Sequence, residues 1–191
     1  MFEKEYPVVY NHLLKYKKML TSRNTAETGI RYEWYALQRW GANYWEDFSK
    51  QKIVWKRVGS ILKFCYDSKD HMALDSTCFA IGNHLKYLLA ILNSDIGYYL
   101  LQDSPKTGTG DLLISVQAIE PLQIPIISDK EEGKIVALID SILYSKNYDN
   151  TEVENEINNA IYTFYNFDQK EIQQIKHIID KTKMQQFIEL Q

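Results

Sequence analysis

The stretch from residue 52 to residue 101 decides the fold and reads KIVWKRVGSILKFCYDSKDHMALDSTCFAIGNHLKYLLAILNSDIGYYLL. Its first part holds three short runs rich in Ile, Val, Trp, Phe and Tyr, separated by Gly59-Ser60 and by the polar tract DSKDHMALD. Runs of this composition between turn residues predict β-strands. We place the strands at Lys52–Val58, Leu62–Tyr66 and Thr77–Ile81.

A helical pattern follows the last of these strands. Asn83 stands where the N-cap of a helix belongs, and leucines recur after it at helical spacing. A second short helical run is expected at Ile96–Leu101. The leucines of the first helix are Leu85, Leu88, Leu89 and Leu92.

The segment before the strands divides in two. Residues 6–21 carry an apolar stripe with the lysines turned elsewhere, which predicts one amphipathic helix. Residues 30–48 are rich in aromatic side chains and have no clean period, so short irregular elements are expected there. The stripe consists of Val9, Leu13, Tyr16 and Leu20.

The C-terminal side changes character after two prolines. Pro121 and Pro125 bracket a segment that can form only an edge or terminal strand, because proline cannot donate to a sheet ladder. Beyond them, capping-box pairs open three helices, through Tyr144, through Tyr165 and toward the C-terminus. The pairs are Ser128 with Glu131, Thr151 with Glu154, and Asp168 with Glu171.

These elements predict a fold of the α/β (mixed α+β) class. We expect a small mixed sheet with flanking helices, followed by a helical C-terminal extension. The predicted division is an α/β domain at residues 1–128 and a helical extension packed on it at residues 129–191. A chain of 191 residues, 45% of them hydrophobic, is long enough to bury such a core.

Composition favours a cytoplasmic location. No apolar run approaches the roughly 18 residues that a membrane helix needs, so no membrane partner is expected. The first residues lack the layout of a secretory signal. Cys65 and Cys78 are expected to be buried thiols on strands, with no chemistry of their own.

The charge is unevenly distributed. Residues 1–66 carry 12 Lys and Arg against 6 Asp and Glu, whereas residues 111–191 carry 7 against 14. All four tryptophans, at positions 34, 40, 45 and 55, fall in the basic third. Lysine and arginine interleaved with aromatic residues favour contact with a polyanion such as nucleic acid, although a solvated basic surface without function is an open alternative.

No catalytic or metal site is predicted. The sequence has no P-loop, no G-x-G-x-x-G motif and no Pro-Pro pair of the kind that an amino-methyltransferase uses. Glu132-Gly133-Lys134, preceded by Asp129, matches a nuclease motif in letters but falls in the first turns of a predicted helix. The four histidines, His12, His71, His84 and His177, are scattered.

What remains is binding. The loop KTGTGD at residues 106–111 can bring backbone amides and threonine hydroxyls close to a phosphate, because glycine removes the steric barrier. A plain turn is an equally open reading of the loop. Candidate phosphate contacts are Lys15, Lys17, Lys18, Arg31, Arg39, Lys50, Lys52, Lys56, Arg57 and Lys63.

The order of segments resembles a known family. It runs YPVVYNHLLKYKKML, RYEWYALQRW, KIVWKRVGSILKFCYD, DSTCFAIGNHLKYLLAILNSDIGYYLL, the GTGD loop and AIEPLQIPII. This series closely resembles the TaqI-like C-terminal specificity domain of type IIG restriction enzymes and related adenine-specific DNA methyltransferases. The tail EINNAIYTFYNFDQKEIQQI resembles the helical end that often closes those proteins.

The resemblance implies a target-recognition domain that docks double-stranded DNA so that a separate domain can methylate an adenine or cleave. S-adenosylmethionine and Mg²⁺ are then expected only in those catalytic domains, and none in this chain. Trp34, Tyr35, Leu37, Gln38 and Arg39 match a recurrent family element, as do Gly108 and Gly110. The expected DNA-binding residues are Arg31, Trp34, Tyr35, Gln38, Arg39, Lys56, Arg57, Lys106, Thr107, Gly108, Thr109 and Gly110.

Two matters stay open at this point. The family's methyltransferase segment, which normally lies N-terminal, is missing from this sequence, so the chain is either a fragment or a free-standing specificity subunit. The alternative function is a protein-interaction module whose acidic helical tail docks a catalytic subunit. An intact nuclease built on Glu132 is the least favoured hypothesis.

Overall fold

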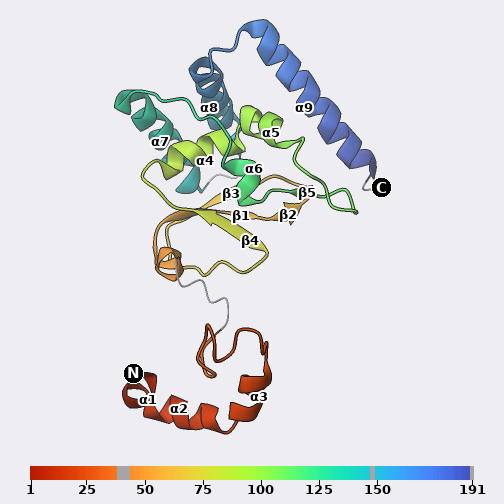
Figure 1. Cartoon of the computed structure of the whole chain (residues 1–191). Coiled ribbons are helices and arrows are strands. Elements are labelled where there is room, and N and C mark those ends of the chain that lie inside the picture. The colour runs from red at the N-terminus through yellow and green to blue at the C-terminus, as the bar shows by residue number, and fades with distance from the viewer. Residues whose placement is uncertain (38–43, 147–148, 190–191) are drawn as a thin grey trace. The chain divides into compact units, whose positions relative to one another are not determined.

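The computed structural model describes residues 1–37, 44–146 and 149–189, with side chains as far as residue 182. The chain divides into two compact units, Met1–Trp45 and Glu46–Gln191 (Figure 1). We call them the N-terminal unit and the C-terminal unit and describe each by itself. The predicted division after residue 128 stays a prediction.

Three short helices begin the N-terminal unit: α1 (Phe2–Glu5), α2 (Pro7–Leu14) and α3 (Lys17–Ser22). The prediction of a single helix over residues 6–21 is wrong, because the backbone leaves the helical conformation at Tyr16. Two members of the apolar stripe, Val9 and Tyr16, are about half exposed, at 48% and 47%. A stripe with so little packing contributes little free energy to hold one long helix together.

Aromatic side chains from two segments pack together in the N-terminal unit. The ring of Phe2 stacks on that of Tyr35 with centroids 4.9 Å apart, and Tyr10 meets Trp34 edge to face at 5.7 Å. Residues 30–37 form turns without a regular helix, as their irregular pattern predicted. We call this group the aromatic cluster; its members are Phe2, Tyr6, Tyr10, Trp34 and Tyr35.

A three-stranded antiparallel sheet in the order β3-β1-β4 forms one layer of the C-terminal unit, with most of the helices on one side of it (Figure 1). Its strands are β1 (Lys52–Lys56), β3 (Phe64–Asp67) and β4 (Thr77–Ala80), which confirms the three predicted strands. A 3-10 helix, η1 (Trp45–Ser49), precedes β1. The first strand ends earlier than predicted, because the chain bends at Arg57 into a separate strand. That strand, β2 (Val58–Gly59), pairs with β5 (Leu112–Leu113).

The two faces of the sheet differ in burial. Ile53 and Trp55 of β1 are buried in the core, whereas Val54 between them faces the other side, which we call the open face. Cys65 lies opposite Val54 and is exposed, and Cys78 lies opposite Trp55 and is half-buried. The prediction of two buried thiols is therefore wrong, because sheet register places the cysteines on different faces.

Helices cover the core face of the sheet (Figure 1). Helix α4 packs on β1 and β3, α7 packs on α4, and α5 contacts α8 and α9. Apolar residues from sheet and helices form one core, so the mixed α+β class and the helical C-terminal part are confirmed. The bounds are α4 (Leu85–Asn93), α5 (Asp95–Leu101), α6 (Val116–Ile119), α7 (Asp129–Leu143), α8 (Thr151–Phe164) and α9 (Gln169–Glu189).

Side-chain caps explain where the C-terminal helices begin. Ser128 and Glu131 form the predicted capping box of α7. At α9, Asp168 Oδ1 accepts from the Glu171 backbone N–H at 2.8 Å, and Glu171 Oε2 accepts from that of Asp168 at 2.8 Å. The box predicted for α8 is wrong, because Asp149 accepts from both the backbone N–H and the hydroxyl of Thr151.

Two smaller predictions are also corrected. His84, not Asn83, is the N-cap residue of α4. The segment between Pro121 and Pro125 pairs with no strand in the described part of the chain and runs as irregular backbone. Among the described residues, no helix combines the length and the apolar character that a membrane span requires.

Candidate nucleic-acid interface

The ribbon formed by β2 and β5 gathers several predicted site residues. Gly59 and Lys106 both pair with Leu112, from opposite sides. The carbonyl of Arg57 accepts from the Ile114 backbone N–H at 2.8 Å, so Arg57 is held beside β5. We call the surface made by Lys56, Arg57 and residues 106–110 the ribbon surface. Lys56 and Arg57 are both exposed.

The glycine loop at the tip of the ribbon is a defined turn. The Thr107 N–H donates to the Asp111 carbonyl at 2.8 Å, and the Gly110 N–H donates to the Thr107 carbonyl at 3.0 Å. The hydroxyls of Thr107 and Thr109 lie 2.8 Å apart, and Thr109 donates to the Asp111 carboxylate at 3.1 Å. Gly110 has a φ of 86°, a conformation that favours glycine. Lys106, Gly108, Thr109 and Gly110 are exposed.

Other predicted contacts belong to the N-terminal unit. The ring of Trp34 lies within the aromatic cluster, where the Lys17 ammonium sits 5.4 Å from its centroid. Tyr35 also packs in the cluster. Arg31 is exposed, and its guanidinium lies 3.6 Å from the Glu27 carboxylate. Gln38 and Arg39 lie outside the described residues.

Lys52 is not available to a phosphate, which corrects its place among the candidate contacts. Its side chain has no exposed surface, and its ammonium lies 2.9 Å from the Asp67 carboxylate. The same ammonium donates to the carbonyls of Phe48 and Lys50 at 2.7 and 3.2 Å. Register places Lys52 beside Asp67 on the open face, and the carbonyls of Phe48, Lys50 and Lys69 enclose its ammonium there.

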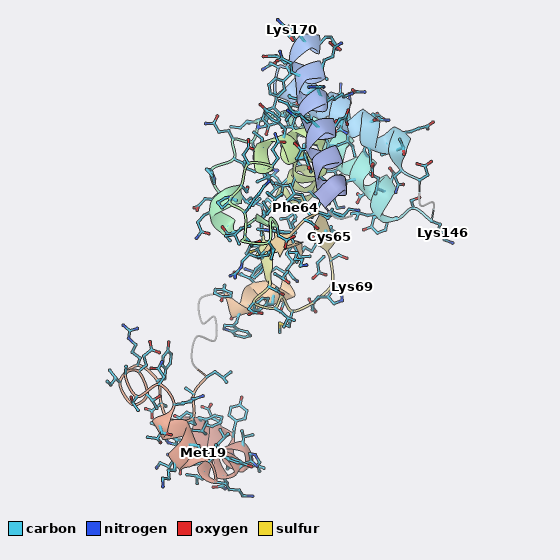
Figure 2. The ribbon with its side chains drawn as sticks, turned by 90° about the vertical axis from the view of Figure 1, so that its right-hand side faces the viewer. Met19, Phe64, Cys65, Lys69, Lys146 and Lys170 are labelled. Atoms are coloured by element: carbon cyan, nitrogen blue, oxygen red, sulfur yellow. The ribbon has the colours of Figure 1, made fainter. Side chains whose placement is uncertain are left out.

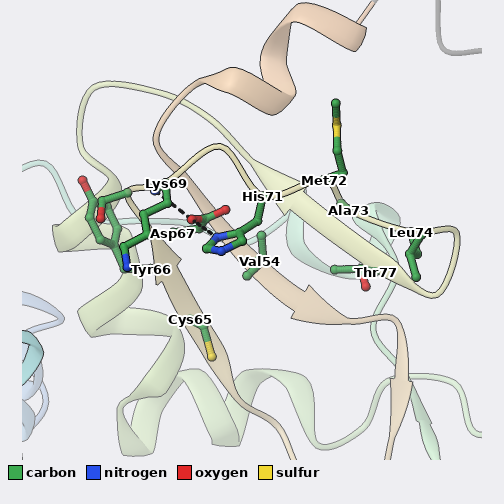
Figure 3. A pocket seen from close by; sticks show the side chains of 11 residues that line it. Val54, Cys65, Tyr66, Asp67, Lys69, His71, Met72, Ala73, Leu74 and Thr77 are labelled. Atoms are coloured by element: carbon green, nitrogen blue, oxygen red, sulfur yellow. Dashed lines mark hydrogen bonds and ion pairs between the residues drawn. The ribbon is translucent and has the colours of Figure 1, made fainter.

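The open face of the sheet also carries a concavity of about 520 Å³ that the sequence did not predict (Figure 3). Val54, Cys65 and Thr77 contribute from the strands, and His71 and Leu74 from the following segment. Figure 2 shows Lys69 of this segment beyond the sheet, on the side away from α7 to α9. The alternation of Lys52, Val54 and Lys56 was the available signal for such a face.

His71 is tied to the sheet through Asp67. Its Nδ1 lies 2.9 Å from Asp67 Oδ1, and the Lys69 backbone N–H donates to the same oxygen at 2.9 Å. Burial raises the pKa of Asp67, but the bonds from His71, Lys52 and Lys69 outweigh it and lower the pKa to about 2. Asp67 is therefore a fixed anion that positions the imidazole.

The sequence model of the TaqI-like C-terminal specificity domain matches residues 4–126. The chain belongs to this family. No curated protein matches it. The match includes the N-terminal helices, the sheet, the ribbon surface and the concavity, whereas the helices α7, α8 and α9 lie beyond it.

In this TaqI-like specificity domain, the residues that match the nuclease motif, Glu132-Gly133-Lys134, are part of helix α7. Glu132 lies in α7 and its carboxylate contacts the Nδ1 of His84 at 2.8 Å. Gly133 and Lys134 continue the same helix, as predicted, so the three residues do not share one strand face. No cluster of three metal-ligating side chains occurs among the described residues.

Proposed function

We propose that this TaqI-like specificity domain reads the sequence of double-stranded DNA for an N6-adenine methyltransferase or type II restriction-modification enzyme, without catalysis of its own. The observation that carries the proposal is the ribbon surface. The two-stranded ribbon carries the glycine loop, and Arg57 is bonded to it through Ile114. Lys56, at the end of β1, adjoins the ribbon, with its Cδ 3.6 Å from the Cβ position of Gly59. The major groove of B-DNA admits a two-stranded β-ribbon, where arginine pairs with guanine edges and lysine contacts phosphates.

The proposed separation of DNA recognition from catalysis rests on the family resemblance. S-adenosylmethionine and Mg²⁺ would belong to separate catalytic domains or subunits, which are the proposed protein partners of this chain. The proposed setting is the cytoplasm, where the chain meets DNA. The proposed DNA-binding residues beyond the ribbon surface are Trp34, Tyr35, Gln38 and Arg39, carried over from the resemblance, and Arg31, a candidate phosphate contact of the same basic segment.

The alternative, an assembly module that docks a partner through its acidic tail, has less support. The apolar residues of the tail that looked like core residues pack inside the C-terminal unit. Ile157, Ile161 and Ile175 are buried, and Leu138 and Ile142 are half-buried against them. In the described part of the tail, these side chains serve the chain's own core.

The test is selection of a randomised duplex library by the full chain at low salt, with sequencing of the retained DNA. We expect one short motif to be enriched and its affinity to fall as salt rises. Arg57→Ala should change the preferred motif, and Lys56→Ala should weaken all duplexes and lower the salt slope by about one. Lys134→Ala, an exposed lysine on α7, is the matched control.

Three outcomes divide the hypotheses. Enrichment that changes in Arg57→Ala supports sequence reading by the ribbon surface. Retention without enrichment means that sequence reading requires the catalytic partner. If no duplex is retained at any salt concentration, DNA binding by the chain itself is contradicted and the assembly module becomes the favoured hypothesis.

A further inference from the structure

We propose that the concavity on the open face binds a single unstacked nucleobase, a planar nitrogen heterocycle. Its volume of about 520 Å³ lies within the range of small-molecule sites in proteins. The proposal rests in part on the proposed function, because DNA held by the ribbon surface is one source of such a base. A free nucleotide is the other source.

His71 supplies a fixed polar group at this site. Asp67 occupies Nδ1 of the ring, which leaves Nε2 to meet a ligand. The carboxylate cannot swing away easily, because Lys52 and the Lys69 backbone also hold it. The imidazole is held through Nδ1, and the side chain is 72% exposed, so a ligand can reach the ring. Because the ring is already held in place, His71 loses little further conformational entropy when a ligand binds.

The remaining lining is mostly apolar. Val54 lines the concavity from β1, and Met72, Ala73 and Leu74 line it from the segment between β3 and β4 (Figure 3). Thr77 adds one hydroxyl at the end of β4. A nucleobase has apolar faces and hydrogen-bonding edges, so apolar walls with His71 and Thr77 at the margins match its chemistry better than that of a sugar or an aliphatic side chain.

Cations stand at both ends of the concavity. Lys69 lines it at one end. At the other end, Lys56 is the cross-strand partner of Thr77 and is exposed on the same face. The carboxylate within the lining, Asp67, is neutralised by Lys52. Phosphates on either side of a bound base would therefore meet positive charge. Lys56 lies between Thr77 of the concavity and Gly59 of β2, so the concavity and the ribbon surface are neighbours.

The experiment uses the full chain and two fluorescent probes. The first is 2-aminopurine deoxyribonucleoside monophosphate, and the second is a duplex with one unpaired 2-aminopurine. Binding is followed by fluorescence anisotropy and by the change in 2-aminopurine emission. An unmodified duplex of the same sequence, labelled at one end, reports DNA binding without a contribution from the pocket.

We expect both probes to bind, and His71→Ala to weaken their binding by about tenfold, because it removes the hydrogen bond of Nε2 to the base. Leu74→Glu should also weaken the binding of both probes. Leu74 is 73% exposed, so this variant leaves the core unchanged. His177→Ala on α9 is the matched control and should have no effect. Binding of the unmodified duplex should change less than twofold in each variant.

Each result has a distinct meaning. If the monophosphate alone binds, the base comes from free nucleotide; if only the duplex probe responds, the base comes from DNA. If neither emission changes while the unmodified duplex still binds, the base site is refuted and the proposed function survives. If the 2-aminopurine emission changes but the unmodified duplex does not bind, the nucleobase site is supported and the proposed recognition of duplex DNA is refuted.

Discussion

The ammonium of Lys52 lies 2.9 Å from the carboxylate of Asp67 across β1 and β3, although Lys52 has no exposed surface. Removing one partner leaves the other charge buried without compensation. We therefore expect Asp67→Ala to lower the free energy of unfolding by about 3–5 kcal/mol. The double variant Lys52→Met with Asp67→Ala should lose less than Asp67→Ala alone. Urea denaturation of the wild-type chain, the two single variants and the double variant measures the coupling between Lys52 and Asp67. Losses of unfolding free energy that simply add in the double variant would contradict it.

Acid should weaken the same interaction. The folded-state pKa of Asp67 is lowered from 3.8 to about 2, so its stabilising effect is complete above the unfolded pKa and is lost as the pH falls toward 2. The free energy of unfolding should drop across this window in the wild-type chain and drop less in Asp67→Asn. Asp103→Asn controls for the loss of one exposed carboxylate. Equal slopes in all three proteins would show that Asp67 is not the responsible group.

Gly97 allows α5 to approach the end of α4. A Cβ at this position would overlap the carbonyl oxygens of Ile91 and Leu92, which are backbone atoms that cannot yield cheaply. Gly97→Ala should lower the free energy of unfolding by about 2 kcal/mol. Gly133→Ala is the matched control, because nothing lies within 4 Å of its Cβ position. Gly133 lies in the second turn of α7, so Gly133→Ala should stabilise the protein by roughly 0.5–1 kcal/mol. Thermal unfolding distinguishes the two.

The two loop glycines should respond differently to alanine. Gly110 has a φ of 86°, so Gly110→Ala strains the turn and should reduce both thermal stability and duplex affinity. Gly108 has no such φ and open space at its Cβ position, so Gly108→Ala should leave the melting temperature unchanged. A loss of duplex affinity in Gly108→Ala alone would then report close approach of DNA. Unchanged affinity in both variants would remove the loop from the interface.

Trp34 and Arg31 should separate structural from binding roles in the N-terminal unit. Trp34→Ala removes ring contacts to Tyr10 and Tyr35 and should speed hydrogen exchange of α2 amides. Arg31→Ala breaks an ion pair with Glu27 whose arginine is exposed and whose atoms lie 3.6 Å apart, and such a pair contributes little to stability. It should leave exchange unchanged and weaken duplex binding. Faster exchange in Arg31→Ala would indicate a structural role instead.

Local signals predicted much of the C-terminal unit. The three strands, the helices α4 and α5 and the capping boxes at Ser128 and Asp168 were all recognisable, because strand composition and capping act over a few residues. The failures lie where the outcome depended on distant partners. The helix of residues 6–21 breaks near Tyr16, and Asp149 replaces Thr151 as the acceptor that begins α8.

The candidate site shows the same division. The KTGTGD loop and Lys56-Arg57 were visible as separate motifs, but only the pairing of β2 with β5 and the backbone bond from Ile114 to Arg57 bring them next to each other. Trp34 was visible as an aromatic residue in a basic segment, but only its contacts with Tyr10 and Lys17 reveal its packing. The concavity beside His71 had no motif, because its lining comes from residues 54–77 through strand register.

The sequence by itself determined the family, the mixed α+β class and the position of most strands and helices, since these follow from local composition and from the order of segments. Tertiary structure alone decided that Lys52 is a buried partner of Asp67 and not a phosphate contact, and that Cys65 and Cys78 face opposite sides of the sheet. The physical reason is register. A shift of one residue in strand pairing turns every side chain to the other face, and the pairing depends on residues far apart in the chain.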